Sequence, residues 1–587
     1  MARRMTTRTM HLALLLAVLT AACTAGTEGR EDPGPPSAGD AALTFIERWN
    51  EGDYDSVVEV IDDPTGREWT ALELEDWIQQ RLERGLVTSF SVQLDGEVSE
   101  PDEAEFENGG SPAVRVPYVV TYQSDAAAEP VELSGDFDLT FDGADDEWVV
   151  GWSKEMLWPG IPGAARFGVA TKWPDRTAIL DRRGRPLARG PAAERSYPFG
   201  SVGGSLVGHV ETLSKKEAEE RTDEGQSGDL VGGSGLEEGL NANLAGTPGF
   251  RLQVLDLSGR VLDVLGRTRA QRSRAVKTTI DIDVQRAAEL AFGDTVGGVA
   301  VIDPRKGDIL AAVGSGPFDP NNYVGAPGVS PFNRGLVGRY PPGSSMKVVT
   351  AAAALEEGVV TPDTPVTGPK EYQGVRNFES GEFGTISFAA ATQYSVNTAY
   401  AQVAEKLGAQ RMLEYAELFG FNETPDVPLV VGTSSFPEPE GLGDLMWASI
   451  GQAQVLATPV QMAEVAGTIA KRGKRMYPRV TLDQKPGGVR VVSRRTASQM
   501  AEMMENVVVG GTGSAARIAG VRVAGKTGTA EVDVDGKRMN HAWFIAFAPV
   551  EAPRVAVAVV AELGGIGGRV AAPLAGQILI NVLPLVE

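Results

Sequence analysis

A serine and a lysine three residues apart form a candidate acylating pair in the middle of this 587-residue chain. Ser344 and Lys347 follow a Pro-Pro-Gly turn and precede the alanine-rich run 348–355, which predicts a helix that ends at Gly358. Residues three apart share a helix face, and free N–H groups at a helix N-terminus favour a developing negative charge. A serine hydroxyl becomes a nucleophile when a neighbour takes its proton, which a lysine does if burial or nearby charge lowers its pKa. Taken alone, however, such a pair is more often a helix cap beside a solvated lysine.

Two later stretches favour the catalytic interpretation. Ser395-Val396-Asn397 lies between the helical patterns 386–393 and 398–407, and Lys526-Thr527-Gly528 lies in the strand-like alternation 521–532. Ser-x-x-Lys, Ser-x-Asn and Lys-Thr-Gly in this order resemble the signature of β-lactamases and penicillin-binding proteins, with Val396 where the second motif usually has aspartate. Other stretches also resemble penicillin-binding transpeptidases: Asn333-Arg334, Pro342-Gly343-Ser344, Gly451-Gln452, Thr458-Pro459 and Gly511-Thr512-Gly513. The resemblance covers Lys277 to the C-terminus and, more weakly, Arg176 to Arg260.

The resemblance implies a role for each motif residue. Ser344 would be the nucleophile, Lys347 its base, and Ser395 a proton relay to the leaving amine. The N–H groups of Ser344 and Thr529 would form the oxyanion hole. Substrate-binding roles fall to Asn397, Lys526, Thr527, Gly528 and Thr529, with Lys526 supplying a fixed positive charge for a terminal carboxylate. No metal and no cofactor is expected.

The function implied is that of a monofunctional (class B) penicillin-binding protein, a peptidoglycan D,D-transpeptidase. Ser344 would attack the penultimate carbonyl of a D-Ala-D-Ala stem peptide, an amine on a neighbouring stem would resolve the ester, and β-lactams would acylate the same serine. Two alternatives stay open: a β-lactam-hydrolysing enzyme or D,D-carboxypeptidase, in which water resolves the ester, and a non-enzymatic β-lactam sensor. Glu356, Glu357 and Glu531 do not fit the position of a deacylating base, so slow hydrolysis is expected.

Composition excludes several other classes of protein. The net charge of −24 argues against a nucleic-acid partner. Three histidines and one cysteine rule out disulfides within the chain and argue against a Ser-His-Asp triad or a zinc site. His541, although close to the third motif, is expected to be a packed histidine at a strand end.

The N-terminus predicts export and a lipid anchor. Residues 1–23 combine arginines with an apolar stretch of eleven residues, too short to span a bilayer, and end in a lipobox-like sequence at Cys23. Cys23 is therefore the expected lipid attachment site, followed by a flexible tether over 24–39. An uncleaved signal anchor or a simple secretory peptide are the alternatives. The expected location is the outer face of the cytoplasmic membrane of a Gram-positive bacterium, with possible cell-wall synthesis partners.

Three folded domains are predicted, giving a multidomain α+β protein. Residues 40–157 show helical patterns at 41–49 and 54–61 and then strand patterns at 87–94, 113–122, 131–141 and 148–152. This segment resembles the nuclear-transport-factor-like N-terminal domain of methicillin-resistance-type transpeptidases, and we expect it to be a spacer, with a binding pocket as the alternative. Residues 158–275 resemble the dimerisation or pedestal domain, in which we expect Glu237 to form an ion pair near Arg176.

The last domain, 276–587, must position the motifs. Strand patterns at 297–302, 307–313, 521–532, 542–548 and 555–562, with a helix at 571–582, suggest a five-stranded antiparallel sheet with helices on both faces, as in the resembled family. A helical subdomain is expected over 348–470. The active site would lie where the sheet and this subdomain meet.

Overall fold

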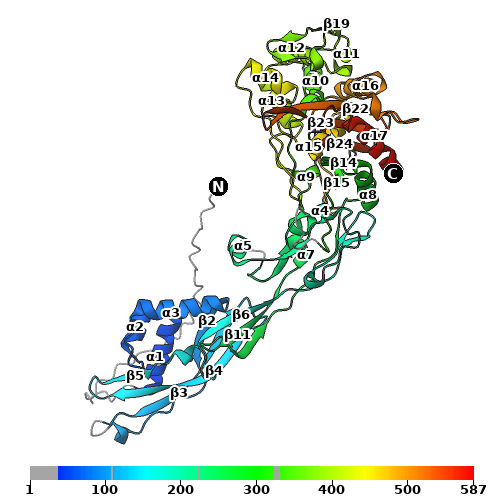
Figure 1. Ribbon diagram of the computed structural model, residues 1–587. Helices are drawn as coiled ribbons and strands as arrows, with labels where there is room; N and C mark the ends of the chain where they lie inside the picture. The colour runs from blue at the N-terminus through cyan, green and yellow to red at the C-terminus, as the bar shows by residue number, and fades with distance from the viewer. Residues whose placement is uncertain (1–36, 107–109, 222–224, 323–329) are drawn as a thin grey trace. The chain divides into compact units, whose positions relative to one another are not determined.

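The computed structural model describes residues 37–106, 110–221, 225–322 and 330–587. The chain forms two compact units (Figure 1). The first contains the residues up to Ala170 together with Phe250–Thr268, and the second contains Thr171–Gly249 and Arg269–Glu587. Among the described residues, no helix combines the length and the apolar character that a membrane crossing requires.

The first unit is built from three helices and a five-stranded sheet of order β1-β5-β4-β3-β2. Its elements are α1 (Ala38–Glu51), α2 (Tyr54–Glu59), β1 (Ile61–Asp62), α3 (Ala71–Arg84), β2 (Val87–Leu94), β3 (Ala113–Ser124), β4 (Val131–Asp142) and β5 (Glu147–Gly151). Figure 1 shows the three helices together on one side of the strands. The core between them is rich in aromatic side chains, including the buried Trp49, Trp152 and Trp158. The predicted helices and strands are confirmed, but α3 was missed, although Thr70 and Glu73 form a capping box at its start.

A hairpin from later in the chain completes the first unit. Strands β11 (Gly249–Leu255) and β12 (Val261–Arg267) form a three-stranded sheet with β6 (Arg166–Lys172), in the order β12-β11-β6. Leu252 and Val254 are fully buried in the same core cluster as the aromatic residues. Residues 250–268 therefore fold with the N-terminal unit, although the sequence places them inside the segment 158–275.

The second unit begins with short elements held by a buried ion-pair cluster. They are β7 (Ile179–Leu180), β8 (Pro186–Ala188), α4 (Gly204–Val207), β9 (Val210–Thr212), α5 (Lys215–Glu220), β10 (Leu230–Gly232), α6 (Gly235–Gly239), α7 (Asn241–Ala245) and β13 (Val276–Lys277). Glu237 is fully buried, and its two carboxylate oxygens accept hydrogen bonds from Arg176 Nε and Arg195 Nε, both at 2.7 Å. The predicted ion pair with Arg176 is confirmed, and Arg195 is a second partner. Glu237 is thus a structural residue of this region.

The large sheet of the second unit has the order β15-β14-β24-β23-β22, and every neighbouring pair is antiparallel. Its strands are β14 (Gly297–Asp303), β15 (Asp308–Val313), β22 (Ala524–Val534), β23 (Lys537–Ala548) and β24 (Val555–Ala561). Alternate residues of β14 face opposite layers. Val299 and Val301 pack with α8 (Ile282–Phe292) and α17 (Ala571–Val582), whereas Ala300 and Ile302 pack with α15 (Pro459–Ala470). The predicted five-stranded antiparallel sheet with helices on both faces is confirmed.

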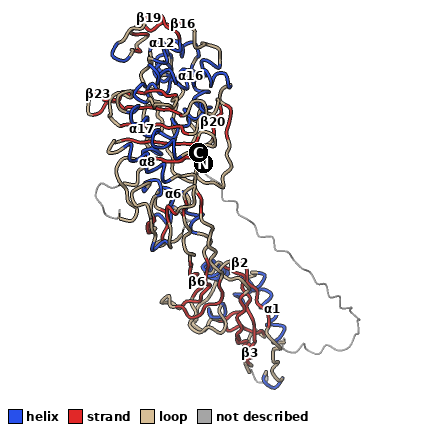
Figure 2. Tube along the Cα trace, turned by 90° about the vertical axis from the view of Figure 1, so that its right-hand side faces the viewer, coloured by secondary structure: helices blue, strands red, loops and turns tan. Residues whose placement is uncertain are grey.

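The helical part of the second unit supplies the other wall of the site. It comprises α10 (Lys347–Glu356), α11 (Phe388–Gln393), α12 (Asn397–Leu407), α13 (Ala409–Leu418), α14 (Leu442–Ser449) and α16 (Arg494–Gly510), with α9 (Arg334–Val337) and the short strands β16 (Pro365–Gly368), β17 (Glu371–Tyr372), β18 (Val375–Arg376), β19 (Gly384–Ser387), β20 (Lys474–Met476) and β21 (Gly488–Arg490). Figure 2 shows α12 and α16 gathered at one end of this unit, away from α8. The edge strand β22 borders this helical part, because both α16 and the turn before α10 pack along it.

Candidate active site

Ser344 lies on a tight turn that packs against the edge strand. A 3₁₀ turn, Gly343–Met346, leads directly into α10, and the Gly343 N–H donates to the Gly451 carbonyl at 2.8 Å. Gly343 has φ of 53°, and a Cβ there would lie 2.7 Å from the Thr529 carbonyl oxygen, so only glycine allows this approach. Ser344 lines an open cleft, whereas Ser345 is buried and its hydroxyl donates to the Pro342 carbonyl at 2.6 Å. Of the two adjacent serines, Ser344 alone faces the cleft.

Lys347 is a buried amine at the base of this cleft. Its Nζ donates to Asn397 Oδ1 at 2.6 Å and to the carbonyl and hydroxyl oxygens of Ser395 at 2.8 and 3.3 Å. Burial lowers the pKa of Lys347 well below its usual value, and the nearby Lys526 lowers that pKa further. Within the described part of the chain, the hydrogen bonds of Nζ go to the second motif and not to the Ser344 hydroxyl. The amine is therefore held by Asn397 and Ser395 and is suited to take a proton.

Ser395 connects the two buried lysines. Its hydroxyl accepts a hydrogen bond from Lys526 Nζ at 2.8 Å on one side and from Lys347 Nζ on the other. Ser395 sits between α11 and α12 with φ of 58°, a left-handed conformation that is uncommon for residues other than glycine and is concentrated at functional sites. Burial lowers the pKa of Lys526 to about 7, so its charge titrates near neutrality in the free protein. The three side chains form one continuous path for a proton.

Strand β22 holds the third motif. A Cβ on Gly528 would lie 2.6 Å from the Pro342 carbonyl oxygen, so this glycine lets the strand approach the serine turn. The Thr527 hydroxyl shares a hydrogen bond of 2.7 Å with the Thr512 hydroxyl, and Thr529 Oγ1 accepts from the Gly567 N–H at 3.2 Å. Thr512 was not among the predicted site residues, although its Gly-Thr-Gly context was already noticed.

The cleft has a volume of about 800 Å³ and brings most of the predicted residues together. Its lining includes Ser344, Ser395, Asn397, Thr527 and Thr529, while Lys347 and Lys526 are fully buried beneath it. The cleft is also lined by residues to which the sequence assigned no role in it, among them Arg376, Tyr394, Trp447, Gln452, Glu531 and Arg569. Gln452 and Glu531 belong to stretches that the sequence singles out, whereas Arg376, Tyr394, Trp447 and Arg569 are brought to the cleft by tertiary packing.

Two other predicted residues lie away from the cleft or outside the described residues. His541, on β23, is half-buried: its Nδ1 accepts from the Leu563 N–H at 3.1 Å, and its ring packs on Tyr340 with 5.3 Å between ring centroids. It is a packed strand histidine, as predicted. Cys23 lies outside the described residues.

Comparison with protein-family models matches all three folded segments. The model described as the penicillin binding protein transpeptidase domain matches residues 297–580. The penicillin-binding protein dimerisation domain matches residues 189–278, and the NTF2-like N-terminal transpeptidase domain matches residues 37–164. All three matches agree with the expected domain types.

Individual relatives point to the same activity class. The peptidoglycan D,D-transpeptidase PbpA of Mycolicibacterium smegmatis is 34% identical over 54% of this chain and 74% of the relative. The peptidoglycan D,D-transpeptidase MrdA of Acinetobacter baumannii is 29% identical. The match covers 64% of this chain and 64% of the length of MrdA. A solved structure of penicillin-binding protein A from M. tuberculosis, a ceftriaxone acyl-enzyme complex, is 29% identical, with a TM-score of 0.57 over 70% of this chain and 98% of that chain. This chain therefore belongs to the class B penicillin-binding proteins, the family of the peptidoglycan D,D-transpeptidases.

Proposed function

We propose that this protein cross-links peptidoglycan stem peptides through an acyl-enzyme on Ser344 and that β-lactams acylate the same serine. The observation that carries the proposal is the buried path Lys347–Ser395–Lys526 beneath a serine that is open to the cleft. A fully buried lysine with a lowered pKa can act as a base at ordinary pH, which a solvated lysine cannot.

Acylation begins with the donor stem peptide. Ser344 Oγ attacks the penultimate D-alanine carbonyl carbon while its proton passes to the Lys347 amine. The N–H groups of Ser344 and Thr529 stabilise the oxyanion, a contribution of about 3 kcal/mol per donor. When the tetrahedral intermediate collapses, the amide bond breaks and the proton returns through Ser395 to the nitrogen of the departing D-alanine.

The second half of the reaction reverses these roles. An amine on a neighbouring stem attacks the ester carbonyl, loses its proton to the Lys347–Ser395 pair, and forms the cross-link as Ser344 Oγ regains a proton. The donor's terminal carboxylate would lie beside Lys526 and the hydroxyls of Thr527 and Thr529. Such an anion favours the charged form of Lys526, whose pKa is lowered by burial to about 7 in the free protein. Substrate binding would thereby hold the proton on this lysine.

The family places this activity on the extracytoplasmic side of the membrane. We extend that proposal to a lipid on Cys23, a Gram-positive host and cell-wall synthesis partners. The lipobox-like sequence that ends at Cys23 supports the anchor, together with the flexible composition of residues 24–39.

Hydrolysis of the acyl-enzyme competes with cross-linking, and it would need an acidic residue in the cleft that can act as a base for water. Glu531 lines the cleft, but it pairs with Arg538 at 3.4 Å, which opposes its use as a base. We expect mass spectrometry with a reporter penicillin to find an adduct on Ser344 that persists for many minutes. Ser344→Ala should abolish this adduct and Ser345→Ala should retain it.

A stem-peptide mimic then separates the possible fates of the ester. With an acceptor amine present, we expect cross-linked product and released D-alanine. Rapid multiple turnover of penicillin would instead identify a β-lactamase, and release of D-alanine without any cross-linking would identify a carboxypeptidase. If penicillin acylated the protein but the stem-peptide mimic did not react, the result would favour the non-enzymatic β-lactam sensor.

A further inference from the structure

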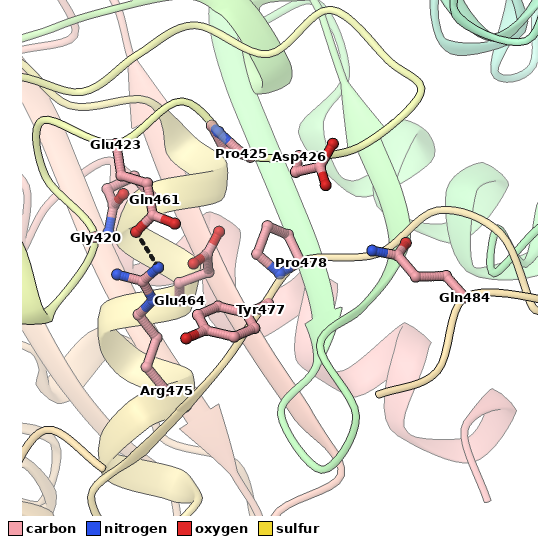
Figure 3. A pocket seen from close by; sticks show the side chains of 10 residues that line it. All are labelled: Gly420, Glu423, Pro425, Asp426, Gln461, Glu464, Arg475, Tyr477, Pro478 and Gln484. Carbon is pink, nitrogen blue, oxygen red and sulfur yellow. Dashed lines mark hydrogen bonds and ion pairs between the residues drawn. The ribbon is translucent and has the colours of Figure 1, made fainter. Parts of the chain in front are cut away.

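A second cavity lies in the same unit, between α15 and the chain on both sides of β20. It has a volume of about 250 Å³ and shares no lining residue with the reactive cleft. Figure 3 shows its lining, which includes Glu423, Asp426, Glu464, Arg475, Tyr477 and Gln484. None of these residues takes part in the chemistry proposed for Ser344.

Glu464 is the unusual residue of this cavity. It lies in the middle of α15 with a relative exposure of 6%, and its Oε1 has no hydrogen-bond partner among the described residues. Leaving a buried carboxyl oxygen unpaired costs free energy, so most such groups in proteins have a partner. In Figure 3 the carboxyl group points into the space bordered by Arg475, Tyr477 and Pro478. Glu464 is thus a buried carboxyl group that faces the cavity with one oxygen able to accept a further hydrogen bond.

Arg475 does not neutralise this carboxyl group. Its Nη2 forms an ion pair with Glu423, drawn as the dashed line in Figure 3, and its Nη1 donates to the carbonyls of Glu417 and Leu418 at 3.4 and 3.3 Å. Burial raises the pKa of Glu464 to about 8; the charge of Arg475 lowers this pKa and that of Glu423 raises it. In the free protein at pH 7, Glu464 therefore retains its proton.

The lining defines the chemistry of a fitting ligand. Three carboxyl groups face one guanidinium. Among the described residues, the buried Gln484 Oε1 is a second acceptor without a hydrogen-bond partner, and Arg475 Nε is a buried donor without one. The carboxyl groups outnumber the single cation and the unpaired acceptors outnumber the unpaired donor, so the lining favours a cation that carries N–H donors. The described residues contain no group of three or more His, Cys, Asp or Glu placed to hold a metal ion, so the candidate ligand taken here is an organic cation.

The volume and the lining of the cavity restrict the size and shape of the organic cation. Its volume corresponds to about eight waters of roughly 30 Å³ each, which suits a molecule of amino-acid size. Tyr477, Pro425 and Pro478 provide apolar and aromatic surface beside the carboxyl groups. An aromatic face of this kind attracts a cation as well as a carbon chain.

We propose that this cavity binds a small organic ammonium, whose N–H groups donate to the Glu464 carboxylate while its carbon chain packs on Tyr477 and Pro478. The ligand class is a primary amine on a short carbon chain. This site is separate from the Ser344 reaction, and its occupancy does not depend on that reaction.

Calorimetry of the full chain with 1,5-diaminopentane tests this assignment. Binding an ammonium must ionise Glu464, so at pH 7 we expect release of about 0.9 proton per bound molecule, from a free pKa of about 8. Titrations in phosphate and in MOPS, which differ in ionisation enthalpy, measure that proton. Neutral 1,5-pentanediol should not bind, and Ser344→Ala should bind the diamine as the unaltered protein does.

Variants locate the binding site. Glu464→Gln should weaken binding at least tenfold and remove the proton release, whereas Glu502→Gln, an exposed residue of α16, should change neither. Three results would overturn the proposal: no saturable heat at 10 mM diamine, equal binding of the diol, or unchanged binding by Glu464→Gln. Each would show that the cavity holds water and does not bind an ammonium. Should Glu464→Gln fail to fold, the size of the proton release by the unaltered protein still decides the question, because Lys526, with a pKa of about 7, is only half protonated at pH 7 and could release at most about 0.5 proton.

Discussion

Replacing Gly528 by alanine should misalign the active site while retaining every catalytic side chain. A Cβ at this position would lie 2.6 Å from the Pro342 carbonyl oxygen, 2.8 Å from Trp543 Cβ and 3.2 Å from the Ser345 nitrogen. The first two are backbone or tightly packed atoms, so the serine turn and β22 must separate. Restoring an ordinary contact of 3.4 Å to the carbonyl oxygen requires a shift of about 0.8 Å.

This displacement predicts the size of the kinetic effect. A misplacement of about 1 Å between reacting groups costs roughly 100-fold in rate, or about 2.7 kcal/mol in activation free energy. Ser344 lies between two of the displaced residues, so Gly528→Ala should acylate about 100-fold more slowly. Overpacking should also lower the free energy of unfolding by about 1–3 kcal/mol.

The assay is the second-order rate constant for acylation by a fluorescent penicillin, with a melting curve for each variant. Gly443→Ala in α14 is the matched control, because a Cβ there meets no atom within 4 Å and alanine favours a helix. We expect this control to acylate within twofold of the unaltered protein. A folded Gly528→Ala protein that acylates within threefold of normal would refute the argument from close approach.

Three further perturbations test other parts of the structure. Glu237→Ala leaves Arg176 and Arg195 buried without their shared carboxylate, so it should lower the free energy of unfolding by about 3–5 kcal/mol in chemical denaturation; a slower acylation of the folded variant would contradict its structural role. The unfolded chain holds the Lys526 proton up to about pH 10. The folded protein holds it only to about pH 7, so stability should rise with pH between these values. Lys526→Met should flatten that rise with pH and raise the free energy of unfolding at pH 7 by roughly 2–4 kcal/mol. It should also abolish acylation. If the melting temperature of the variant depended on pH as that of the unaltered protein does, the result would count against a buried amine whose pKa is lowered. Cys23→Ala should remove the label of a fatty-acid probe and release the protein from membranes, and an unlabelled native protein that stays in the membrane would reject the lipid anchor.

Sequence reasoning predicted regular elements better than it predicted the walls of the cleft. The strands of the large sheet and helix α17 could be predicted because their apolar periodicity and the Asp535-Gly536 turn are local signals. The motif residues could be predicted because each lies in a short, specific pattern. Arg376, on the short strand β18, and Trp447, on α14, could not, because tertiary packing alone brings these elements to the cleft.

The interpretation of one motif residue, Lys526, changed for a physical reason. Lys526 was expected to carry a fixed charge, but complete burial lowers its pKa to about 7, and the depth of a side chain cannot be read from its motif. The predicted substrate-binding role of Gly528 stays a prediction, and the structure adds that a side chain at this position would clash with the serine turn. Helix α3 was missed because its apolar residues are interspersed with acids, and the capping box at Thr70 was the available signal.

The hairpin β11–β12 has a consequence for the order in which the chain can fold. The N-terminal unit needs strands from residues 249–267, which are synthesised about eighty residues after β6 is complete. Until then β6 presents an unpaired edge, and Leu252 and Val254 are missing from the core. A fragment that stops at residue 170 would therefore be an incomplete domain prone to association. Any exchange of this unit between relatives must transfer two separate stretches of gene, because neither encodes a whole domain.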